Sequence, residues 1–442
     1  MKKGIFLVWL GMVVIGTSNA QTTFDLQACI DYTLNHHAST EVYQNQMAIS
    51  AQQAREAVSG YLPQVNGAAS LDDNLKRQTT IIPAGVFSQE DIKVQFGNQY
   101  STTATVQMDQ VIYDQSLIYG LKASQPNREI SRLKKEKNEE DLITQTAKAY
   151  YQVLATRQKL DLLAENEQKF QEQLELVKLQ YEKGIAKKID YDRLRVSLNN
   201  VRSQQQVLKT NEELALNRLK LAMGLPQEAE LELTGISLMD LTISQPESEA
   251  FSPQNNLDLQ LQVQNIALQE IDLQRKSASR LPSVSAYGRY GAQDLGNELG
   301  ASYGNWFDFF SIGLKVNVPI FGGMRRNSQI SQSRLNLENA RINYELTQQN
   351  LDMQLQNAYT ALTSARISLE NNQENLALAK DVFDNSSLQY QKGVAPFSDF
   401  INSDFAYKEA QNNYINSVLD YLTARLDYER AGGSLTEYIQ QL

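Results

Sequence analysis

The sequence has very few of the residues on which catalytic and metal sites are usually built. Among its 442 residues it contains one cysteine, Cys29, and two histidines, His36 and His37. A lone cysteine excludes an intramolecular disulfide and a zinc site made of several thiolates. Adjacent histidines face different sides of a helix, so they do not predict a metal site. Because no nucleotide-binding or nucleophile motif accompanies them, the sequence predicts neither an enzyme nor a bound cofactor.

Long hydrophobic runs are also missing, except at the N-terminus. Residues 1–20 combine two lysines, a short apolar run and small residues up to Ala20, which predicts a secretory signal peptide cleaved after Ala20. Gln21 follows this site instead of a cysteine, which argues against a lipid anchor. No later stretch approaches the roughly 20 apolar residues of a membrane-spanning helix, so a membrane role would require a β-barrel. The net charge of −10 argues against a nucleic-acid partner.

Helix breakers are scarce and clustered, with nine prolines and 22 glycines in the whole chain. Helices are expected over 24–59 and 256–279, and two further stretches predict helices of about 60 residues, roughly 90 Å long. Apolar residues in the long stretches alternate between spacings of three and four, as at Leu362, Ala365 and Leu369. This is the pattern of coiled-coil packing. The same spacing predicts that Tyr181 lies in the core between the packed helices.

One short segment occurs twice and divides the chain into halves. LQYEKGIA at Leu179–Ala186 and LQYQKGVA at Leu388–Ala395 are identical at six of eight positions. The Lys-Gly pair is typical of a helix C-terminus, since the cation suits the negative end of the helix dipole and glycine adopts the left-handed conformation. Each copy lies between two helical segments. We therefore predict that each copy is the tip of a long helical hairpin and that the chain consists of two repeats.

Alternating hydrophobicity predicts a pair of strands in each repeat. The first pair is expected at 64–80 and 98–112 around a loop at 81–97, and the second pair on either side of a loop at 294–304. From Phe310 to Val318 the even positions are apolar and the odd ones small or polar, which indicates a strand with one apolar and one polar face. A half-buried strand of a soluble sandwich would fit one such strand equally well. The aromatic residues around it and the signal peptide favour a membrane strand.

These patterns divide the chain into five parts. We expect a signal peptide at 1–20, a first repeat at 21–225, a linker at 226–254, a second repeat at 255–433 and a C-terminal tail at 434–442 that is either a short helix or loose.

The order and the duplication of these elements resemble the TolC family of outer-membrane efflux proteins. The resemblance covers residues 22–433 and rests on the two tips, on Leu62-Pro63 and Leu281-Pro282 before the strands, and on VIYD and PIFGG after them. It implies a mainly α fold with a four-stranded β contribution in two tandem repeats. Four strands are too few to close a barrel. The family accordingly implies a homotrimer with a 12-stranded barrel and a long α-helical barrel in the periplasm.

The same resemblance implies a function and partners. The chain is expected to be the outer-membrane exit duct of a tripartite efflux or type I secretion system. A periplasmic adaptor would couple it to an inner-membrane pump, and its strands would contact outer-membrane lipid. The family's adaptor-contact pattern maps onto Gly184-Ile185 and Gly393-Val394. The alternative is that these residues serve only as helix-ending turns.

The resemblance also implies a constriction at the tips, formed by one or more rings of acidic residues. Asp399 stands at one acidic position of the family, Asn402 replaces the second, and Asp404 could complete the ring. A helix N-cap is the competing interpretation of Asp399, and Asp190 has the same two interpretations in the first repeat. The family further implies that Tyr390 helps to hold the tip closed; ordinary packing in the helix core is the alternative.

The polar face of the strands is expected to line the barrel lumen, with Asp109, Lys315 and Asn317 facing the solute. Two rival functions remain at this stage. A structural or adhesive envelope protein would explain the coiled-coil pattern but not the strands or the duplication. A secreted enzyme has no candidate catalytic residues to support it. The transported substrate, the class of pump and the resting state of the tip do not follow from the sequence.

Overall fold

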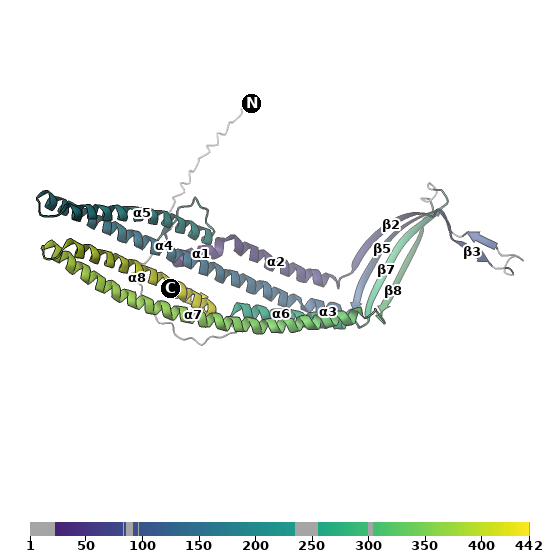
Figure 1. Ribbon diagram of the computed structural model, residues 1–442. Helices are drawn as coiled ribbons and strands as arrows, with labels where there is room; N and C mark the ends of the chain where they lie inside the picture. Colours follow the sequence, from purple (N-terminus) through teal and green to yellow (C-terminus); the bar gives the residue numbers. More distant parts are fainter. Residues whose placement is uncertain are drawn as a thin grey trace, which may run out of the picture. The chain divides into compact units, whose positions relative to one another are not determined.

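The computed structural model describes residues 23–82, 84, 92–95, 97–234, 255–298 and 304–441 (Figure 1). The predicted signal peptide and most of the predicted linker lie outside the described residues. The helices are α1 Leu26–His36, α2 Ala38–Ser59, α3 Gln115–Lys122, α4 Ser124–Glu182, α5 Lys188–Met223, α6 Leu257–Ala278, α7 Arg325–Gln391, α8 Phe397–Gly432 and α9 Leu435–Gln440. The strands are β1 Thr23–Phe24, β2 Gln64–Asp73, β3 Thr79–Ile82, β4 Ile92–Gln95, β5 Tyr100–Tyr113, β6 Glu232–Leu233, β7 Ser283–Gly296 and β8 Phe307–Asn317.

This order of elements confirms the predicted mainly α fold with a four-stranded sheet. The long helices are α4 with 59 residues and α7 with 67 residues, and each is followed by a returning helix of 36 residues, α5 and α8. The prediction of one helix over 24–59 was wrong, because the chain breaks at His37, whose ψ of 130° is extended. Gly224 lies next to this break: a Cβ at its position would lie 3.0 Å from the Cα of His37, so this close contact requires a glycine at 224.

The four-stranded sheet is antiparallel, in the order β2-β5-β7-β8. Its register places Asp109 opposite Tyr287 and Tyr287 opposite Gly313, so these residues share one face. Side chains of successive strand residues alternate between faces. One face is therefore mainly polar and the other mainly apolar, as predicted. Among the described residues, no strand pairs with the outer edge of β2 or of β8.

A second small sheet occupies part of the segment predicted as a loop at 81–97. Strands β3 and β4 form an antiparallel pair in which Thr80 lies opposite Val94. The prediction of a plain loop was therefore wrong at these positions. The β-branched residues at Thr79–Ile82 and at Ile92 and Val94 favour extended backbone, but the strands are too short for their alternation to be recognised in the sequence.

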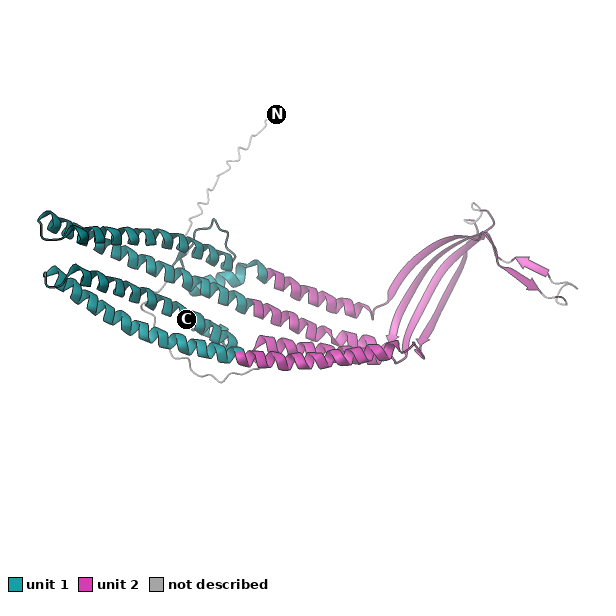
Figure 2. Ribbon diagram, viewed as in Figure 1, with its two compact units in different colours: residues 1–40, 139–251, 354–442 teal, residues 41–138, 252–353 magenta. Residues whose placement is uncertain are grey.

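The chain divides into two compact units, coloured separately in Figure 2. Unit 1 comprises residues 1–40, 139–251 and 354–442, and unit 2 comprises 41–138 and 252–353. Each unit takes segments from both halves of the sequence. The units therefore do not coincide with the two predicted repeats, whose boundaries at 21–225 and 255–433 remain a prediction.

The core of unit 1 includes the C-terminal tail. Leu435 is fully buried and Ile439 is 3% exposed, both from α9. Of the two alternatives for residues 434–442, the short helix is therefore correct. None of the described helices is both long and apolar enough to cross a membrane.

Candidate functional site

The duplicated segments form two helical tips in unit 1 (Figure 1). At the first tip the N–H of Ile185 donates to the carbonyl oxygen of Gln180 at 2.8 Å, and the N–H of Gly184 donates to that of Tyr181 at 2.9 Å. Gly184 has a φ of 74°. This is the Schellman motif, in which a left-handed glycine satisfies the last carbonyl groups of a helix.

The second tip repeats this geometry. The N–H of Val394 donates to Gln389 and the N–H of Gly393 donates to Tyr390, both at 2.9 Å. Gly393 has a φ of 72°. The six identical positions of the two segments therefore encode the same turn, which confirms the predicted hairpin tips.

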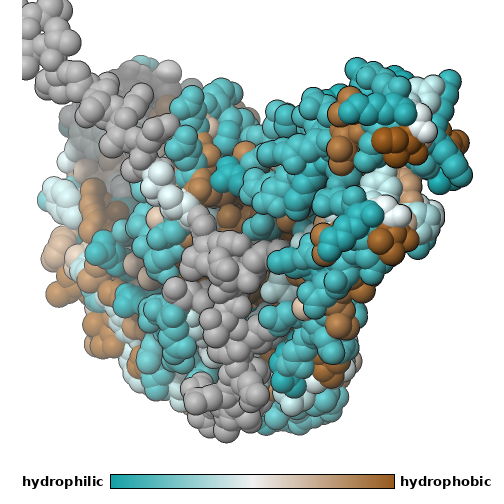
Figure 3. Space-filling model, turned by 90° about the vertical axis from the view of Figure 1, so that its left-hand side faces the viewer, coloured by the Kyte–Doolittle hydropathy of each residue, from teal (hydrophilic) through white to brown (hydrophobic). Residues whose placement is uncertain are grey.

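Each tip exposes an aliphatic residue directly after its glycine. The exposed fraction is 74% for Ile185 and 78% for Val394, and a Cβ added at Gly184 or Gly393 would meet nothing within 4 Å. Figure 3 looks onto this end, where hydrophilic side chains dominate and hydrophobic ones form separate patches. The predicted docking residues are thus on the surface of the single chain, and their role in docking stays a prediction.

Below the turns, the second tip packs against the first hairpin through aromatic rings. Tyr390 lies 5.4 Å from Phe397 and 5.5 Å from Phe400, measured between ring centroids. Phe397 and Phe400 belong to the same buried cluster as Phe170 of α4. Burial raises the pKa of Tyr390, and the carboxylate of Asp190 adds to this rise. Tyr390 therefore has a packing role, whatever further part it plays in holding the tip closed.

Tyr181 corresponds to Tyr390 in the first tip but has a different environment. It is 41% exposed and stacks on Tyr191 of α5 at a centroid distance of 6.3 Å. The prediction that Tyr181 lies in the core was wrong. The two tips are therefore not equivalent.

The acidic residues beside the tips occupy the first turns of the returning helices. The N-cap of α8 is Pro396 and that of α5 is Lys187, and neither makes a side-chain capping bond. Asp399 and Asp190 each lie three positions after the cap, so the interpretation of either as an N-cap was wrong. A carboxylate in the first turn still interacts favourably with the helix dipole. Asp399 and Asn402 are exposed, and the predicted ring remains untested for both.

Asp404 lies in a different environment from Asp399. It is 6% exposed and accepts a hydrogen bond from Lys408 at 2.6 Å. The ammonium of Lys408 also lies 3.6 Å from the centroid of the Phe170 ring, a cation–π contact. Burial raises the pKa of Asp404 and lowers that of Lys408, each against the attraction of the partner charge. This burial argues against the predicted place of Asp404 in an exposed acidic ring.

A cavity of about 390 Å³ adjoins this ion pair. It lies between α4 and the second hairpin and is lined by Phe170, Phe383, Asp384 and Asp404, among others. Neither the cavity nor Lys408 was predicted from the sequence. A signal for the pair was present, because an acidic and a basic residue four positions apart meet on a helix surface. The spacing does not reveal that this surface is buried.

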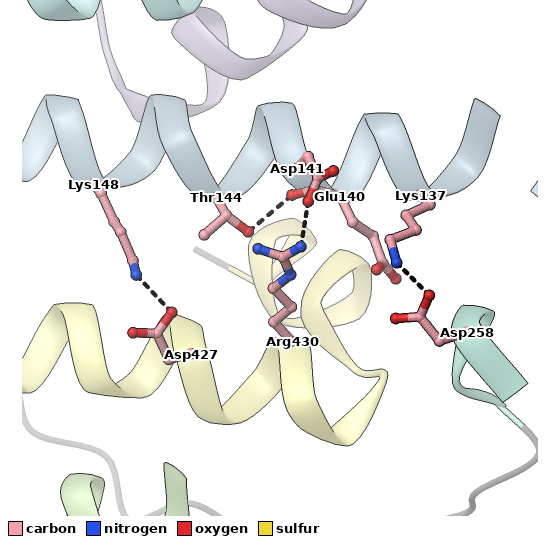
Figure 4. A network of polar contacts seen from close by, with 8 residues as sticks. All are labelled: Lys137, Glu140, Asp141, Thr144, Lys148, Asp258, Asp427 and Arg430. Carbon is pink, nitrogen blue, oxygen red and sulfur yellow. Dashed lines mark hydrogen bonds and ion pairs between the residues drawn. The ribbon is translucent and has the colours of Figure 1, made fainter. Parts of the chain in front are cut away.

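Further from the tips, ion pairs tie α4 to the returning helix α8 within unit 1 (Figure 4). Lys148 contacts Asp427 at 2.6 Å, and Arg430 donates to Asp141. All four side chains are partly exposed, so each pair is expected to contribute at most about 1 kcal/mol. These bridges connect the first long helix to α8 and make only a small contribution to their packing.

In unit 2, the three predicted lumen residues lie on the polar face of the sheet. The register aligns the odd positions of β5, β7 and β8, which include Asp109, Lys315 and Asn317. Asp109 accepts a hydrogen bond from Gln107 at 2.9 Å. The polar face is thus organised by contacts among its own side chains, and its position towards a lumen remains a prediction.

Among the described residues, no group of three or more His, Cys, Asp or Glu side chains could hold a metal ion. Buried Cys29 has a raised pKa of about 12 because of its burial. It is therefore a protonated, unreactive thiol at neutral pH.

Known proteins with related sequences or structures include outer membrane proteins, a secretion protein and transmembrane channels. TolC of Escherichia coli K12 is 20% identical over 357 residues, which is 77% of this chain and 71% of that protein. The alkaline protease secretion protein AprF of Pseudomonas aeruginosa is 20% identical over 328 residues, 73% of this chain and 68% of that protein. The crystal structure of CusC, studied for its folding and transmembrane channel formation, covers 92% of this chain and 91% of its own, with a TM-score of 0.76 and 14% identity.

A sequence profile of one family matches both halves of the chain. It describes outer membrane efflux proteins and covers residues 35–225 and 252–434, most of the sequence. The two matched segments include both tips and all four long strands. The chain therefore belongs to the outer membrane efflux protein family, whose members are exit ducts in the outer membrane that extend into the periplasm.

Proposed function

We propose that three copies of the chain form one continuous duct, with a shared β-barrel in the outer membrane and a shared helical tube in the periplasm. The observation that carries this proposal is the sheet of unit 2. On β5 the apolar Val106 and Met108 are exposed, at 52% and 44%, while the polar Thr105, Gln107 and Asp109 are partly buried. A sheet with one exposed apolar face and one partly buried polar face is suited to a barrel wall that has lipid outside and water inside.

The edges of the sheet support the same proposal. In the described parts of the chain, strands β2 and β8 each have a neighbour on one side only. An open edge exposes unpaired N–H and C=O groups, which have no water to bind within a bilayer. Pairing β8 of one copy with β2 of the next removes all edges, and three copies of four strands reach the number needed for a barrel.

We further propose that a periplasmic adaptor docks on the tips and couples the duct to an inner-membrane pump. The exposed aliphatic residues Ile185 and Val394 offer it a small apolar surface at each tip. The duct itself would be passive. Opening would be a shift between two packings of the tip helices, biased by the adaptor.

The oligomer and the pore can be tested together. Detergent-purified protein should appear as a trimer by native mass spectrometry and should produce stepwise conductance in planar bilayers. A monomer that gives no conductance steps would instead favour a structural or adhesive role in the envelope.

Asp399→Ala is expected to weaken the block of the pore by multivalent cations by about tenfold, because three converging carboxylates favour such ions. The measurement is the half-blocking concentration in planar bilayers. Asp399→Glu is the matched control, since it keeps the negative charge in the first turn of α8 and should retain the block. An unchanged block in Asp399→Ala would contradict the acidic ring. The carboxylate of Asp399 would then only stabilise the first turn of α8.

Lys315→Glu is expected to increase the preference of the pore for cations several-fold, because it reverses a charge on the polar face of β8 in every copy. The measurement is the reversal potential across a potassium chloride gradient. Lys315→Gln should give about half of this shift. Leu314→Gln, on the opposite face of the same strand, should leave the reversal potential unchanged; an equal shift there would contradict the assignment of the faces.

A further inference from the structure

A pocket lies in unit 2 where β8 ends and α7 begins. It has a volume of about 250 Å³, and its lining includes Arg280, Ile320, Phe321, Met324 and Arg326. Ser283 at the start of β7 pairs with Asn317 at the end of β8. The pocket therefore lies at the end of the sheet from which the long helix starts, which is the periplasmic end of the proposed barrel.

The pocket contains positive charge without a protein counter-charge. Arg280 donates to the amide oxygen of Asn327 at 2.7 Å. The guanidinium of Arg326 lies against Gly322, where an added Cβ would be 3.1 Å from its nitrogen. Within the described parts of the chain, neither arginine pairs with a carboxylate. In a protein of net charge −10, these two side chains stay available for an external anion.

Exposed apolar side chains adjoin the arginines. The exposed fraction is 92% for Ile320 and 81% for Phe321, and Val316 and Val318 are 60% and 54% exposed. The apolar face of β8 thus continues directly into the pocket. In a bilayer, an apolar surface meets basic side chains at the level of the lipid headgroups.

The corresponding place in the first repeat is built differently. There the carboxylate of Asp114 accepts hydrogen bonds from the N–H groups of Ser116 at 2.8 Å and Leu117 at 3.2 Å, and Tyr61 donates to the carbonyl oxygen of Asp114. A strand-to-helix turn therefore does not need arginines. The second repeat also holds Met324 at a φ of 65°, which is uncommon for a residue other than glycine.

We propose that this pocket binds the headgroup of an anionic phospholipid from the periplasmic leaflet of the outer membrane. Arg280 and Arg326 contact the phosphate, since guanidinium groups match its oxygens in geometry and charge. The acyl chains lie along Ile320, Phe321 and the apolar face of β8. This proposal rests on the membrane-embedded sheet proposed above.

The test compares two double variants that remove the same charge. Arg280→Gln/Arg326→Gln changes the pocket, whereas Arg334→Gln/Arg341→Gln changes two exposed arginines further along α7. The purified proteins are mixed with phosphatidylglycerol in detergent, and bound lipid is measured by native mass spectrometry. The pocket variant should bind phosphatidylglycerol at least about tenfold more weakly, since each basic residue near a lipid surface contributes roughly fivefold. The control variant should bind as the unchanged protein does.

Further arms identify the ligand. Phosphatidylcholine, which has no net charge, should bind more weakly than phosphatidylglycerol, and millimolar inorganic phosphate should not displace the lipid. Equal lipid binding by the two double variants, or displacement by inorganic phosphate, would overturn the proposal. Trimer mass and conductance are measured on the same samples. If the unchanged protein formed no trimer and gave no conductance, the proposed duct would be contradicted. If it formed a conducting trimer that did not prefer phosphatidylglycerol, only the lipid site would be contradicted.

Discussion

Gly393→Trp is expected to abolish cross-linking between the second tip and its periplasmic adaptor and to reduce efflux or secretion to the level of a strain without the protein. The backbone of Gly393 is left-handed, so any side chain there costs about 1 kcal/mol. A Cβ added at Gly393 meets nothing within 4 Å in the single chain. Trimer and barrel should therefore survive, and the indole should occupy the surface on which the adaptor docks. The measurement is site-specific photo-cross-linking from position 394.

Two controls separate bulk from backbone strain. Gly393→Ala carries the same strain with little bulk and should retain most of the cross-linking. Gly97→Trp introduces the same side chain at another left-handed glycine that has open space, with a φ of 93°, in a segment between strands. It should leave cross-linking unchanged. Full cross-linking in Gly393→Trp would refute docking at this tip, and equal losses in Gly393→Ala and Gly393→Trp would trace the effect to the turn.

The fold was predictable where the pattern was long or repeated. The heptad spacing of the long helices, the alternation in β8 and the duplicated Lys-Gly tips all correspond to observed elements, because each signal extends over many residues or occurs twice. The break between α1 and α2 was missed. It lies at His37, which packs against Gly224 from a distant part of the chain, and no local sequence signal at His37 announces it.

The candidate site was predictable only in part. The turns at Gly184 and Gly393 follow from local chemistry, so their geometry could be foreseen. Asp399, Asn402 and Asp404 were all considered for the constriction, yet the first two are exposed and Asp404 is buried. Burial of an acidic residue depends on which helices pack over it. The aromatic residues from α4, α7 and α8 that surround Asp404 come from both halves of the chain, so one helix alone does not reveal them.

Removing one member of the Asp404–Lys408 pair is expected to destabilise the tip by about 3–5 kcal/mol, because the remaining charge is left buried without a partner. Lys408→Met leaves the carboxylate and Asp404→Leu leaves the ammonium. The double variant Asp404→Leu/Lys408→Met should lie close to the unchanged protein or above it, since the pair's own desolvation cost disappears. The measurement is the apparent unfolding temperature together with the rate of proteolysis at the tips. A double variant as unstable as the single ones would show that packing, not charge, sets the loss.

The two single variants should respond to pH in opposite directions. The pKa of Asp404 is raised by burial, so the fold loses stability as pH rises through that pKa and the carboxyl group ionises. It regains this stability as pH falls and the group is protonated. Without Lys408 the pKa rises further, and Lys408→Met should therefore recover stability in mild acid. The pKa of Lys408 is lowered by burial and by neighbouring Lys169, so the fold gains stability as pH rises and the ammonium group loses its proton. Asp404→Leu should recover in mild alkali. Parallel pH profiles for the two variants would contradict the buried-pair interpretation. Opposite profiles would show that each buried charge is stable only in the presence of its partner. Opening the adjoining cavity to water would then reduce the free-energy cost of an unpaired charge at Asp404 or Lys408.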